Sequence, residues 1–399
     1  MIGKSRKYCA PRRLSYPLWL MDLLVDIYAQ FFYKRRARPK VESPRFLILM
    51  SGHLGDALTM SYLFPLIQKT YPECSIDVVV GDWCDPILVN NPCIRRIIHL
   101  NHATTNRRNI SKIAKWRDHI RTTRTAIKSL KNETYSVFID LRFSDSPFLF
   151  LLPFLQVQKA VGFGTRGLGG LLDEEFFLPD REFHHLELLL DVLGAVGVKA
   201  TLADINPYFN FPEKASQTLA QKLPFLNQAQ PYILLCPESG AASRFLPNDF
   251  WIELAGKVLH QQQGLLIGCG QQNQTKELLQ QIKMAYPTYE ERVYDAVAQL
   301  NLNELAALSQ KAAIAFTLES LPAHLCSIYC PTVSFFYNGT GLQFFPLSNF
   351  PILIFHNHVF SKNLSIERPG FLSQYVEAFD EEVIARAMDW VQTLNLSHH

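Results

Sequence analysis

Hydrophobic and polar positions alternate in a regular way from about residue 44 onward. An apolar run at 45–51 has the length of a buried strand, and an amphipathic helical pattern follows it at about 56–69. Short apolar runs alternating with amphipathic stretches are typical of βαβ units around a parallel sheet. The next strands are expected at 76–80, 96–100, 137–141 and 159–163, and the next helices at 109–130 and 184–196. This part of the chain predicts one doubly wound α/β domain.

The same pattern starts again at 232–237, after Pro207, Pro212 and Pro224 have interrupted the periodicity. Further strands are expected at 265–269, 293–297, 313–317 and 332–336, with helices at 247–261, 276–285, 302–310 and from 322. The repeat predicts two Rossmann-like α/β domains that face each other across a cleft. In open α/β sheets, ligands bind beyond the carboxyl ends of the strands, so we expect the chemistry in strand-end loops.

The expected organisation has four parts: a basic, amphipathic segment at 1–43, an N-terminal domain at 44–210, a C-terminal domain at 230–380, and a helix and tail at 381–399. A chain of 399 residues with 48% apolar and 19% charged residues suits two globular cores. Its eight cysteines are scattered without zinc-ligand spacing. We therefore expect reduced thiols in a cytosolic protein.

The first 40 residues carry ten basic residues against Asp22 and Asp26, a net charge of +8. Two basic clusters flank an apolar run at 14–33, where Asp22, Asp26 and Gln30 would form one polar stripe on a helix. Acids near the middle disfavour a membrane-spanning helix, and the flanking residues do not suit a cleaved signal peptide. An in-plane helix on an anionic cytoplasmic membrane surface is expected. A helix packed on the protein's own core is the alternative.

The first strand leads into a turn that ends in an acid, Ser51-Gly52-His53-Leu54-Gly55-Asp56. Gly52 and Gly55 would allow a tight turn, and the helix N-terminus behind them would favour an anion. Asp56 has two open interpretations. It is a residue type that caps helices, and a carboxylate at a strand end can also take a proton from an attacking hydroxyl.

Two later strand ends carry polar loops. In the loop from Pro237 to Pro247, Ser239 and Gly240 would expose backbone N–H groups, and Arg244 suits a diphosphate. In the turn from 317 to 324, Glu319, Ser320 and His324 stand around a helix start, although a lone histidine on a helix is often structural. These loops predict a phosphate-binding region.

Together the three loops resemble those of glycosyltransferase family 9, the bacterial lipopolysaccharide heptosyltransferases and their relatives. The family's Leu-Gly-Asp turn is similar to Leu54-Gly55-Asp56, which implies that Asp56 is the catalytic base. Its Pro-Gly-Ala loop, followed by Lys-x-Trp-Pro, resembles the loop from Pro237, with Arg244 in place of the phosphate-binding lysine. The resemblance spans about 45–345 and implies GT-B architecture.

The family's Asp-Ser/Thr-Gly-x-x-His turn, which grips the donor diphosphate, resembles the turn from Glu319 to His324. This implies donor contacts by Ser239, Gly240, Arg244, Glu319, Ser320 and His324. The sequence departs from the family pattern at several positions, and in this turn Glu319 replaces the aspartate. Leu321 replaces the glycine that lets the backbone approach phosphate, Leu246 replaces the tryptophan, and Cys236 replaces a frequent histidine.

The helix expected at 109–130 carries a basic stripe beside an apolar face. Residues 101–133 hold nine basic residues against Asp118 and Glu133, a net charge of +7. The stripe is either a solvated helix face or a docking surface for an anionic acceptor or lipid headgroups. Nucleic acid is not expected, since no nucleic-acid fold is recognisable. The residues concerned are Arg117, Arg121, Arg124 and Lys128.

We therefore expect an inverting transfer of a sugar, heptose by the resemblance, from a nucleotide-activated donor such as ADP-heptose. The expected acceptor is a lipopolysaccharide core or another lipid-linked saccharide at the cytoplasmic membrane surface. Neither a cofactor nor a metal is expected, because the chain has no Asp-x-Asp motif. Two alternatives are a non-catalytic relative that binds glycan or protein, which Leu321 favours, and another sugar-nucleotide enzyme such as an epimerase.

Overall fold

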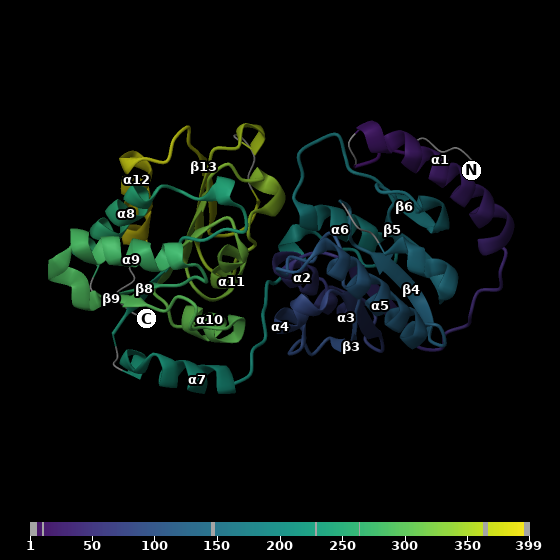
Figure 1. Ribbon diagram of the computed structural model, residues 1–399, viewed down its shortest axis with the longest axis horizontal. Helices are drawn as coiled ribbons and strands as arrows, with labels where there is room; N and C mark the ends of the chain where they lie inside the picture. Colours follow the sequence, from purple (N-terminus) through teal and green to yellow (C-terminus); the bar gives the residue numbers. More distant parts are fainter. Residues whose placement is uncertain are drawn as a thin grey trace. The chain divides into compact units, whose positions relative to one another are not determined.

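The computed structural model describes residues 6–9, 12–144, 148–227, 230–262, 264–361 and 366–394. The chain forms two compact units, Met1–Ile205 and Asn206–His399. Each unit is built around its own parallel sheet, as the ribbon in Figure 1 shows. The boundary falls at residue 205, so the proline-rich stretch after it belongs to the second unit.

The first unit contains six strands in the described part of the chain: β1 (Arg45–Met50), β2 (Ser75–Val80), β3 (Ile94–His99), β4 (Thr134–Asp140), β5 (Gln156–Phe163) and β6 (Glu174–Phe176). Its α-helices are α1 (Arg12–Tyr28), α2 (Leu54–Ser61), α3 (Phe64–Thr70), α4 (Asp85–Leu88), α5 (Lys112–Leu130) and α6 (His185–Gly194). Shorter turns of 3₁₀ or π helix are η1 (Ala29–Tyr33), η2 (Asp82–Cys84), η3 (Leu149–Phe154), η4 (Gly169–Leu171) and η5 (Leu202–Asp204).

The first sheet has the strand order β3-β2-β1-β4-β5-β6, and its strand pairs are parallel. Leu47 and Leu49 of β1 point to one side, into a core cluster that also takes residues from α5, η1 and η3. Phe46 and Ile48 point to the other side. Because βαβ crossovers are right-handed, α2 lies on that other side, where it contacts β1 and α6. Both faces of the sheet are thus covered.

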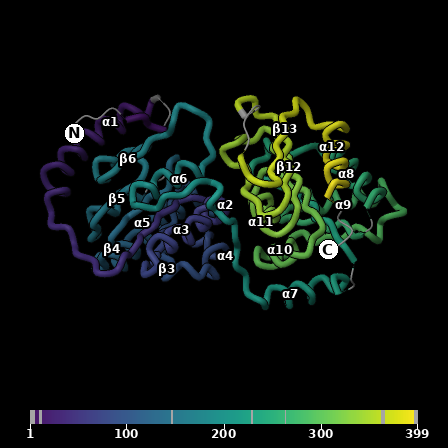
Figure 2. Tube along the Cα trace, turned by 180° about the vertical axis from the view of Figure 1, so that it is seen from behind, coloured from purple at the N-terminus to yellow at the C-terminus, as the bar shows by residue number. Residues whose placement is uncertain are grey.

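The N-terminal helix α1 lies beside the edge strand β6, as both the ribbon and the view from behind show (Figures 1 and 2). It continues without a break into η1, whose Ala29 and Tyr33 are buried in the core cluster of the first sheet. The guanidinium of Arg36 donates hydrogen bonds to the carbonyls of Leu152 and Leu155, at 3.2 and 2.8 Å. The segment is therefore docked on the first unit through defined contacts.

The second unit contains β7 (Tyr232–Cys236), β8 (Leu265–Gly268), β9 (Val293–Asp295), β10 (Ile314–Leu318), β11 (Thr332–Phe336), β12 (Ile352–His356) and β13 (Phe371–Tyr375). Its α-helices in the described residues are α7 (Lys214–Lys222), α8 (Asn248–Gln261), α9 (Asn273–Ala285), α10 (Leu302–Ser309), α11 (Leu321–Tyr329) and α12 (Glu381–Thr393). Short helical turns are η6 (Pro224–Asn227), η7 (Ala242–Arg244), η8 (Pro287–Arg292), η9 (Gly341–Phe344) and η10 (Val359–Ser361).

The second sheet has the order β13-β12-β11-β10-β7-β8-β9. Along β7, Ile233 and Leu235 join one core cluster, with α8, α9 and α12, whereas Leu234 joins another, with α7, α10 and α11. This alternation shows that helices cover both faces of the sheet. The last helix, α12, packs through Val383 and Ile384 into the core of the second unit.

Some elements differ from the sequence prediction. The stretch expected as one helix at 56–69 forms two helices, α2 and α3, because the chain turns at Tyr62 and Leu63. Pro65 then occupies the first turn of α3, where a missing N–H group is tolerated. The strands β6, β12 and β13 were not predicted. The cysteines are free thiols, six of them buried, as expected from their spacing.

Candidate active site

The first unit has its switch point between β1 and β4, the two neighbouring strands at which the strand order reverses direction. The turn after β1 carries Gly52, Gly55 and Asp56, and β4 ends at Asp140. Ligands of doubly wound sheets bind beyond the carboxyl ends of the strands at this point. The fold therefore places Asp56 where a substrate would bind to this unit.

Asp56 is not the N-cap of its helix, which corrects one sequence interpretation. The N-cap of α2 is His53, and Asp56 is the third helical residue, whose carboxylate accepts the backbone N–H of His53 at 2.7 Å. This is the return bond of a capping box. Its other oxygen, Oδ1, lies 3.4 Å from a guanidinium nitrogen of Arg142. The carboxylate is about one-fifth exposed, so it combines a structural contact with access to solvent.

The two glycines of the turn differ in what they permit. A side chain at Gly52 would clash with Asp56, since its Cβ would lie 2.4 Å from the Asp56 Cβ. Gly52 is thus required for the folded-back position of the aspartate, and its carbonyl accepts the indole N–H of Trp83 at 2.9 Å. At Gly55 a Cβ would meet nothing within 4 Å. The tight approach expected at both glycines occurs only at Gly52.

Arg142, beside Asp56 in the first site, was not singled out from the sequence. Asp140 ends β4 fully buried, and its carboxylate accepts the backbone N–H groups of Arg142 at 3.0 Å and Phe148 at 2.6 Å. These bonds shape the start of the loop that carries Arg142 to Asp56. No motif marks Arg142, because its contact with Asp56 depends on β4 lying next to β1. Asp140 is thus a positioning residue for Arg142.

Burial raises the pKa of the Asp140 carboxyl to about 7 from an ordinary value of 3.8, although its two backbone hydrogen bonds and Arg142 favour the charged form. Between about pH 4 and about pH 7, Asp140 is protonated in the folded protein and ionised in the unfolded chain. The free energy of unfolding should therefore fall as pH rises from about 4 to about 7. In Asp140→Asn this contribution is absent.

Urea unfolding of the parent and Asp140→Asn at pH 5 and pH 7.5 measures this effect. The stability of the variant relative to the parent should increase by at least about 1.4 kcal/mol between the two pH values, the equivalent of one pKa unit. A difference that does not change with pH would contradict the raised pKa.

The second unit has its switch point between β7 and β10. The loop after β7 carries Ser239, and its hydroxyl donates to the carbonyl of Glu319, in the turn after β10, at 2.9 Å. The carboxylate of Glu238 accepts the backbone N–H groups of Gln271 and Gln272, at 2.8 and 2.9 Å, so it holds the neighbouring loop. The two loops identified from the sequence therefore meet at this switch point, where Gly240 is exposed.

Arg244 lies at the end of η7, with its guanidinium 3.1 Å from a carboxylate oxygen of Glu319. The Arg244 side chain is about one-third exposed, whereas Glu319 is buried. Glu319 also accepts the backbone N–H of Thr340 at 2.9 Å and its hydroxyl at 2.7 Å. A Cβ at Gly339 would lie 1.8 Å from a Glu319 oxygen, so this approach requires glycine. Glu319 thus acts as an anchor that orients Arg244.

The helix α11 starts directly after Glu319. Ser320 occupies its N-cap, partly exposed, with its hydroxyl 3.3 Å from the carbonyl of Leu318. Leu321 takes the first helical position and is partly exposed, and His324 is buried, with 7% of its surface accessible. A helix N-terminus favours an anion. Ser320 therefore stands at an anion-favouring position, and the structure gives His324 the burial of a packed residue.

The basic stripe of the first unit lies on α5. Arg117, Arg121, Arg124 and Lys128 are exposed, and Arg121 pairs with Asp118 at 2.5 Å. The apolar residues of this helix separate into two sets, which the sequence had placed on one face. Leu130 is buried and Ile127 packs on the core, whereas an outward patch is formed by Ile113, Trp116 and Ile120. The stripe and this patch share the exposed side of the helix.

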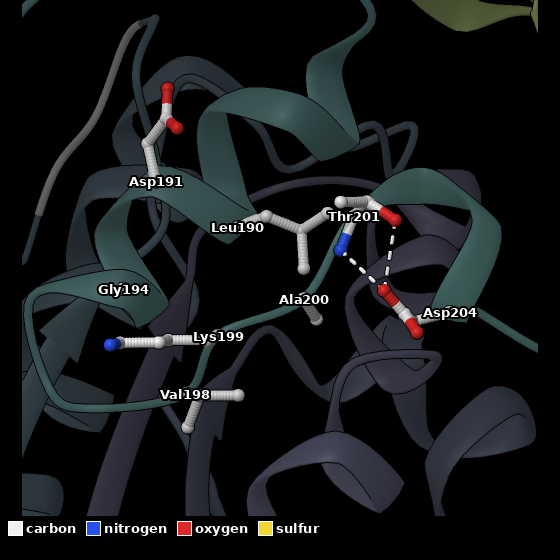
Figure 3. Close-up of a pocket in the computed structure, with 8 residues that line it drawn as sticks. All are labelled: Leu190, Asp191, Gly194, Val198, Lys199, Ala200, Thr201 and Asp204. Atoms are coloured by element: carbon white, nitrogen blue, oxygen red, sulfur yellow. Dashed lines mark hydrogen bonds between the residues drawn. The ribbon is translucent and has the colours of Figure 1, made fainter.

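A groove on the first unit is lined by residues 190–204. Figure 3 shows it beside the end of α6, where Asp204 accepts hydrogen bonds from the backbone and the hydroxyl of Thr201, both at 2.8 Å. These bonds belong to a capping box of η5. Its lining contains none of the predicted site residues, so the strand-end loops remain the candidate site. Within the described ranges, no three His, Cys, Asp or Glu side chains gather as they would around a metal.

Two Rossmann-like units with polar loops at their switch points are typical of the GT-B fold. The sequence matches the family described as glycosyltransferase family 9 (heptosyltransferase) over residues 123–365. The chain belongs to this family and is a heptosyltransferase-like glycosyltransferase. The family predicted from the sequence is confirmed.

Three relatives illustrate the similarity. The chain is 23% identical to lipooligosaccharide heptosyltransferase 2 of Haemophilus influenzae over 314 residues, covering 75% of this chain and 85% of that protein. It is 20% identical to lipopolysaccharide heptosyltransferase 3 of Escherichia coli strain K12 over 290 residues, covering 71% and 79%. Its fold is similar to that of the E. coli ADP-heptose lipopolysaccharide heptosyltransferase II structure, with a TM-score of 0.64, 17% identity, and coverage of 88% of this chain and 99% of that chain.

Proposed function

We propose that this protein transfers a sugar, heptose in the first instance, from a nucleotide-activated donor to a lipid-linked saccharide such as a lipopolysaccharide core. The proposed place of the reaction is the cytoplasmic face of the membrane. The observation that carries the proposal is that Asp56 and Arg244 each stand at the switch point of a sheet. The relatives named for heptose transfer and for ADP-heptose support the choice of donor.

In this proposal Asp56 is the general base. Its Oδ1 oxygen would accept the proton of the acceptor hydroxyl, and that hydroxyl would displace the nucleoside diphosphate directly, with inversion at the anomeric carbon. Arg142, 3.4 Å from Asp56, would hold the carboxylate in its orientation before the proton moves. The return bond from His53 leaves the second oxygen available for this step.

The donor diphosphate would bind to the second unit. Arg244 is held by Glu319, and the N-terminus of α11 begins next to that acid, so a guanidinium and a helix dipole act on one region. Ser239, Gly240 and Ser320 would supply further hydrogen bonds, and His324 would support the helix from its buried position. These groups would stabilise the leaving diphosphate without a metal ion. Leu321 would make the approach to the phosphate less close than glycine allows.

The acceptor would carry negative charge that the basic stripe of α5 attracts. We expect Arg117→Gln with Arg124→Gln to raise the acceptor KM about tenfold, because each basic residue near an anionic surface contributes about 1 kcal/mol and part of this is screened. The donor KM should stay the same. Steady-state kinetics with each substrate varied would show this, and equal acceptor KM values would indicate a solvated helix face.

The experiment that tests the whole proposal is a transfer assay with purified protein. ADP-heptose and other nucleotide sugars are offered with lipopolysaccharide cores of defined length, and mass spectrometry detects the added sugar and the released nucleoside diphosphate. Lipopolysaccharide from a deletion strain should lack the same sugar. If the folded protein binds a glycan but transfers nothing from any nucleotide sugar, the non-catalytic alternative is correct.

A further inference from the structure

The helix formed by α1 and η1 turns its two acids toward the protein, whereas Gln30 of the predicted polar stripe is exposed. Asp22, Asp26, Ala29 and Tyr33 are buried, and their spacings of four, three and four residues place them on one side of the helix. A helix docked on a soluble domain usually buries its apolar stripe instead. Here two carboxylates face inward, so the apolar side of the helix faces outward.

A buried charge network holds this orientation. The guanidinium of Arg6 donates to both oxygens of Asp26, at 3.1 and 2.8 Å, and to Glu175 of β6 at 2.6 Å. Asp22 accepts the hydroxyl of Tyr8 at 2.7 Å and the backbone N–H of Leu168 at 2.6 Å. Buried charges are retained only when such bonds compensate for their lost hydration. Rotating the helix to bury its apolar side would break the contacts of Asp22 and Asp26.

A glycine-rich loop of the first unit lets the helix approach closely. A Cβ at Gly170 would lie 2.3 Å from a carboxylate oxygen of Asp26, and one at Gly167 would lie 2.4 Å from the terminal carbon of Met21. Gly167 also has a φ of +91°, a conformation that glycine adopts without strain. The loop is thus shaped to receive the polar side of α1, and the outward position of the apolar side is a built feature of the fold.

The outward side is large, apolar and rich in aromatic rings. Trp19 stacks near Tyr16 with ring centroids 5.9 Å apart, and Tyr28 lies near Phe32 at 6.1 Å. A contiguous apolar patch of this kind on a soluble protein marks an interaction site. The residues with 40% or more of their surface exposed are Leu14, Tyr16, Trp19, Leu20, Leu24, Ile27, Tyr28, Phe31 and Phe32, and we call them the outer face of α1 and η1.

The charges around the outer face indicate which partner it fits. Asp22 and Asp26 are the acids of residues 1–40, and both are buried. The exposed charges of the described part of this segment are therefore cations, namely Lys7, Arg13, Lys34, Arg35 and Lys40. Trp and Tyr between basic ends are typical of helices that lie in the headgroup region of an anionic bilayer. None of the helices in the described ranges is long and apolar enough to cross a membrane.

A second element on the same side of the sheet has the same character. The helix α5 packs on the core cluster that also receives Ala29 and Tyr33 of η1, so both elements cover one side of the first sheet. The outward patch of α5, with Ile113, Trp116 and Ile120, lies beside its basic stripe. Both elements covering this side of the first unit thus combine exposed apolar and basic residues.

We propose that the outer face of α1 and η1 inserts in the plane of an anionic phospholipid leaflet, with the Arg6 network holding the helix in this inverted orientation. This surface would hold the enzyme at the membrane. The proposal rests on the proposed function, because a lipid-linked acceptor is the reason for the enzyme to bind the membrane. The lipid contact itself is independent of sugar transfer, so the two can be tested separately.

The test compares two double variants of the full chain by flotation with vesicles of phosphatidylglycerol and phosphatidylethanolamine. Leu24→Glu with Phe32→Glu places two charges on the outer face, and we expect vesicle affinity to fall about thirtyfold. Met284→Glu with Phe360→Glu is the matched control, since both residues are highly exposed and lie in the second unit. The control should bind as the parent does, and thermal melts should show that both variants fold.

Brominated lipids give a second readout. The fluorescence of Trp19 should be quenched in vesicles, and Trp19→Phe should lose that part of the quenching. The inference is overturned if the parent does not bind anionic vesicles, if the outer-face variant binds equally well, or if light scattering shows that the outer face joins two copies of the chain instead.

The variant Leu24→Glu with Phe32→Glu should still transfer sugar to a detergent-dispersed acceptor. The two proposals can fail separately. If the parent transfers no sugar but binds vesicles, and these substitutions abolish that binding, the proposed function is contradicted and the membrane contact is supported.

Discussion

Replacing Asp56 with Asn is expected to lower the turnover of sugar transfer about 10²- to 10⁴-fold, which is the usual contribution of general-base catalysis. An amide cannot take the proton of the acceptor hydroxyl. The amide oxygen can still accept the backbone N–H of His53, so the capping box is kept and stability should change by no more than about 1 kcal/mol. Donor affinity should be nearly unchanged, because the donor is proposed to bind to the second unit.

The chain offers a matched control for this experiment. Asp204 also stands third in a short helix and returns a capping-box bond, here to Thr201, but it lies away from the switch point. Asp204→Asn should therefore retain full turnover. Single-turnover transfer and thermal melts of both variants provide the measurement. If Asp56→Asn keeps more than about half of the parental rate, Asp56 acts only as a capping residue.

Replacing Arg244 with Ala is expected to weaken binding of the nucleotide sugar about 10- to 150-fold, equivalent to about 1.5 to 3 kcal/mol for a charge-assisted hydrogen bond. The effect should appear as a higher donor dissociation constant in calorimetry. Arg386→Ala is the control, because Arg386 also pairs with a glutamate, Glu382, at 3.8 Å, but lies on α12. Its donor affinity should equal that of the parent.

The ion pair with Glu319 requires a second variant. Removing Arg244 takes away the ion-pair partner of the buried Glu319 carboxylate, whose hydrogen bonds from Thr340 remain. The loss of this ion pair could loosen the loop that carries Arg244 and so weaken donor binding indirectly. Arg244→Lys keeps the positive charge but loses the planar fork, so donor affinity should lie between those of Arg244→Ala and the parent. If Arg244→Ala binds the donor as tightly as the parent does, the diphosphate does not bind to this loop.

The two sheets and their strand-end loops could be predicted from the sequence. Apolar runs such as 45–50 and 232–236 are unambiguous because a strand buried on both faces needs a continuous apolar segment. The half-exposed strand β13 and the three-residue strand β6 escaped prediction, since their patterns resemble loops. The strand β12 was also missed, although residues 352–356 form a buried apolar run. The helix break at Tyr62 and Leu63 also escaped, because the apolar pattern continues through it.

The candidate site was only partly predictable. Asp56, Arg244 and Glu319 stand at strand ends, and residue order alone places strand ends at one edge of a parallel sheet. Arg142 and Thr340 were missed, since each comes to the site through a neighbouring strand whose position depends on strand order. The role of Asp56 within the capping box could not be assigned either, because it depends on where the backbone of His53 enters the helix.

Amino-acid order alone was enough to establish two α/β units, the family, and an amphipathic basic segment at the N-terminus, because these depend on local periodicity and on motifs read along the chain. The orientation of that segment was decided only by tertiary structure. Periodicity shows that Asp22 and Asp26 share one side of a helix, but it does not show which side is buried. Arg6 and Glu175, 169 residues apart, and the loop at Gly170 turn the acids inward. The apolar side of the helix is exposed because these long-range contacts of Asp22 and Asp26 are more favourable than burial of the apolar side. The pattern of the helix alone does not show this.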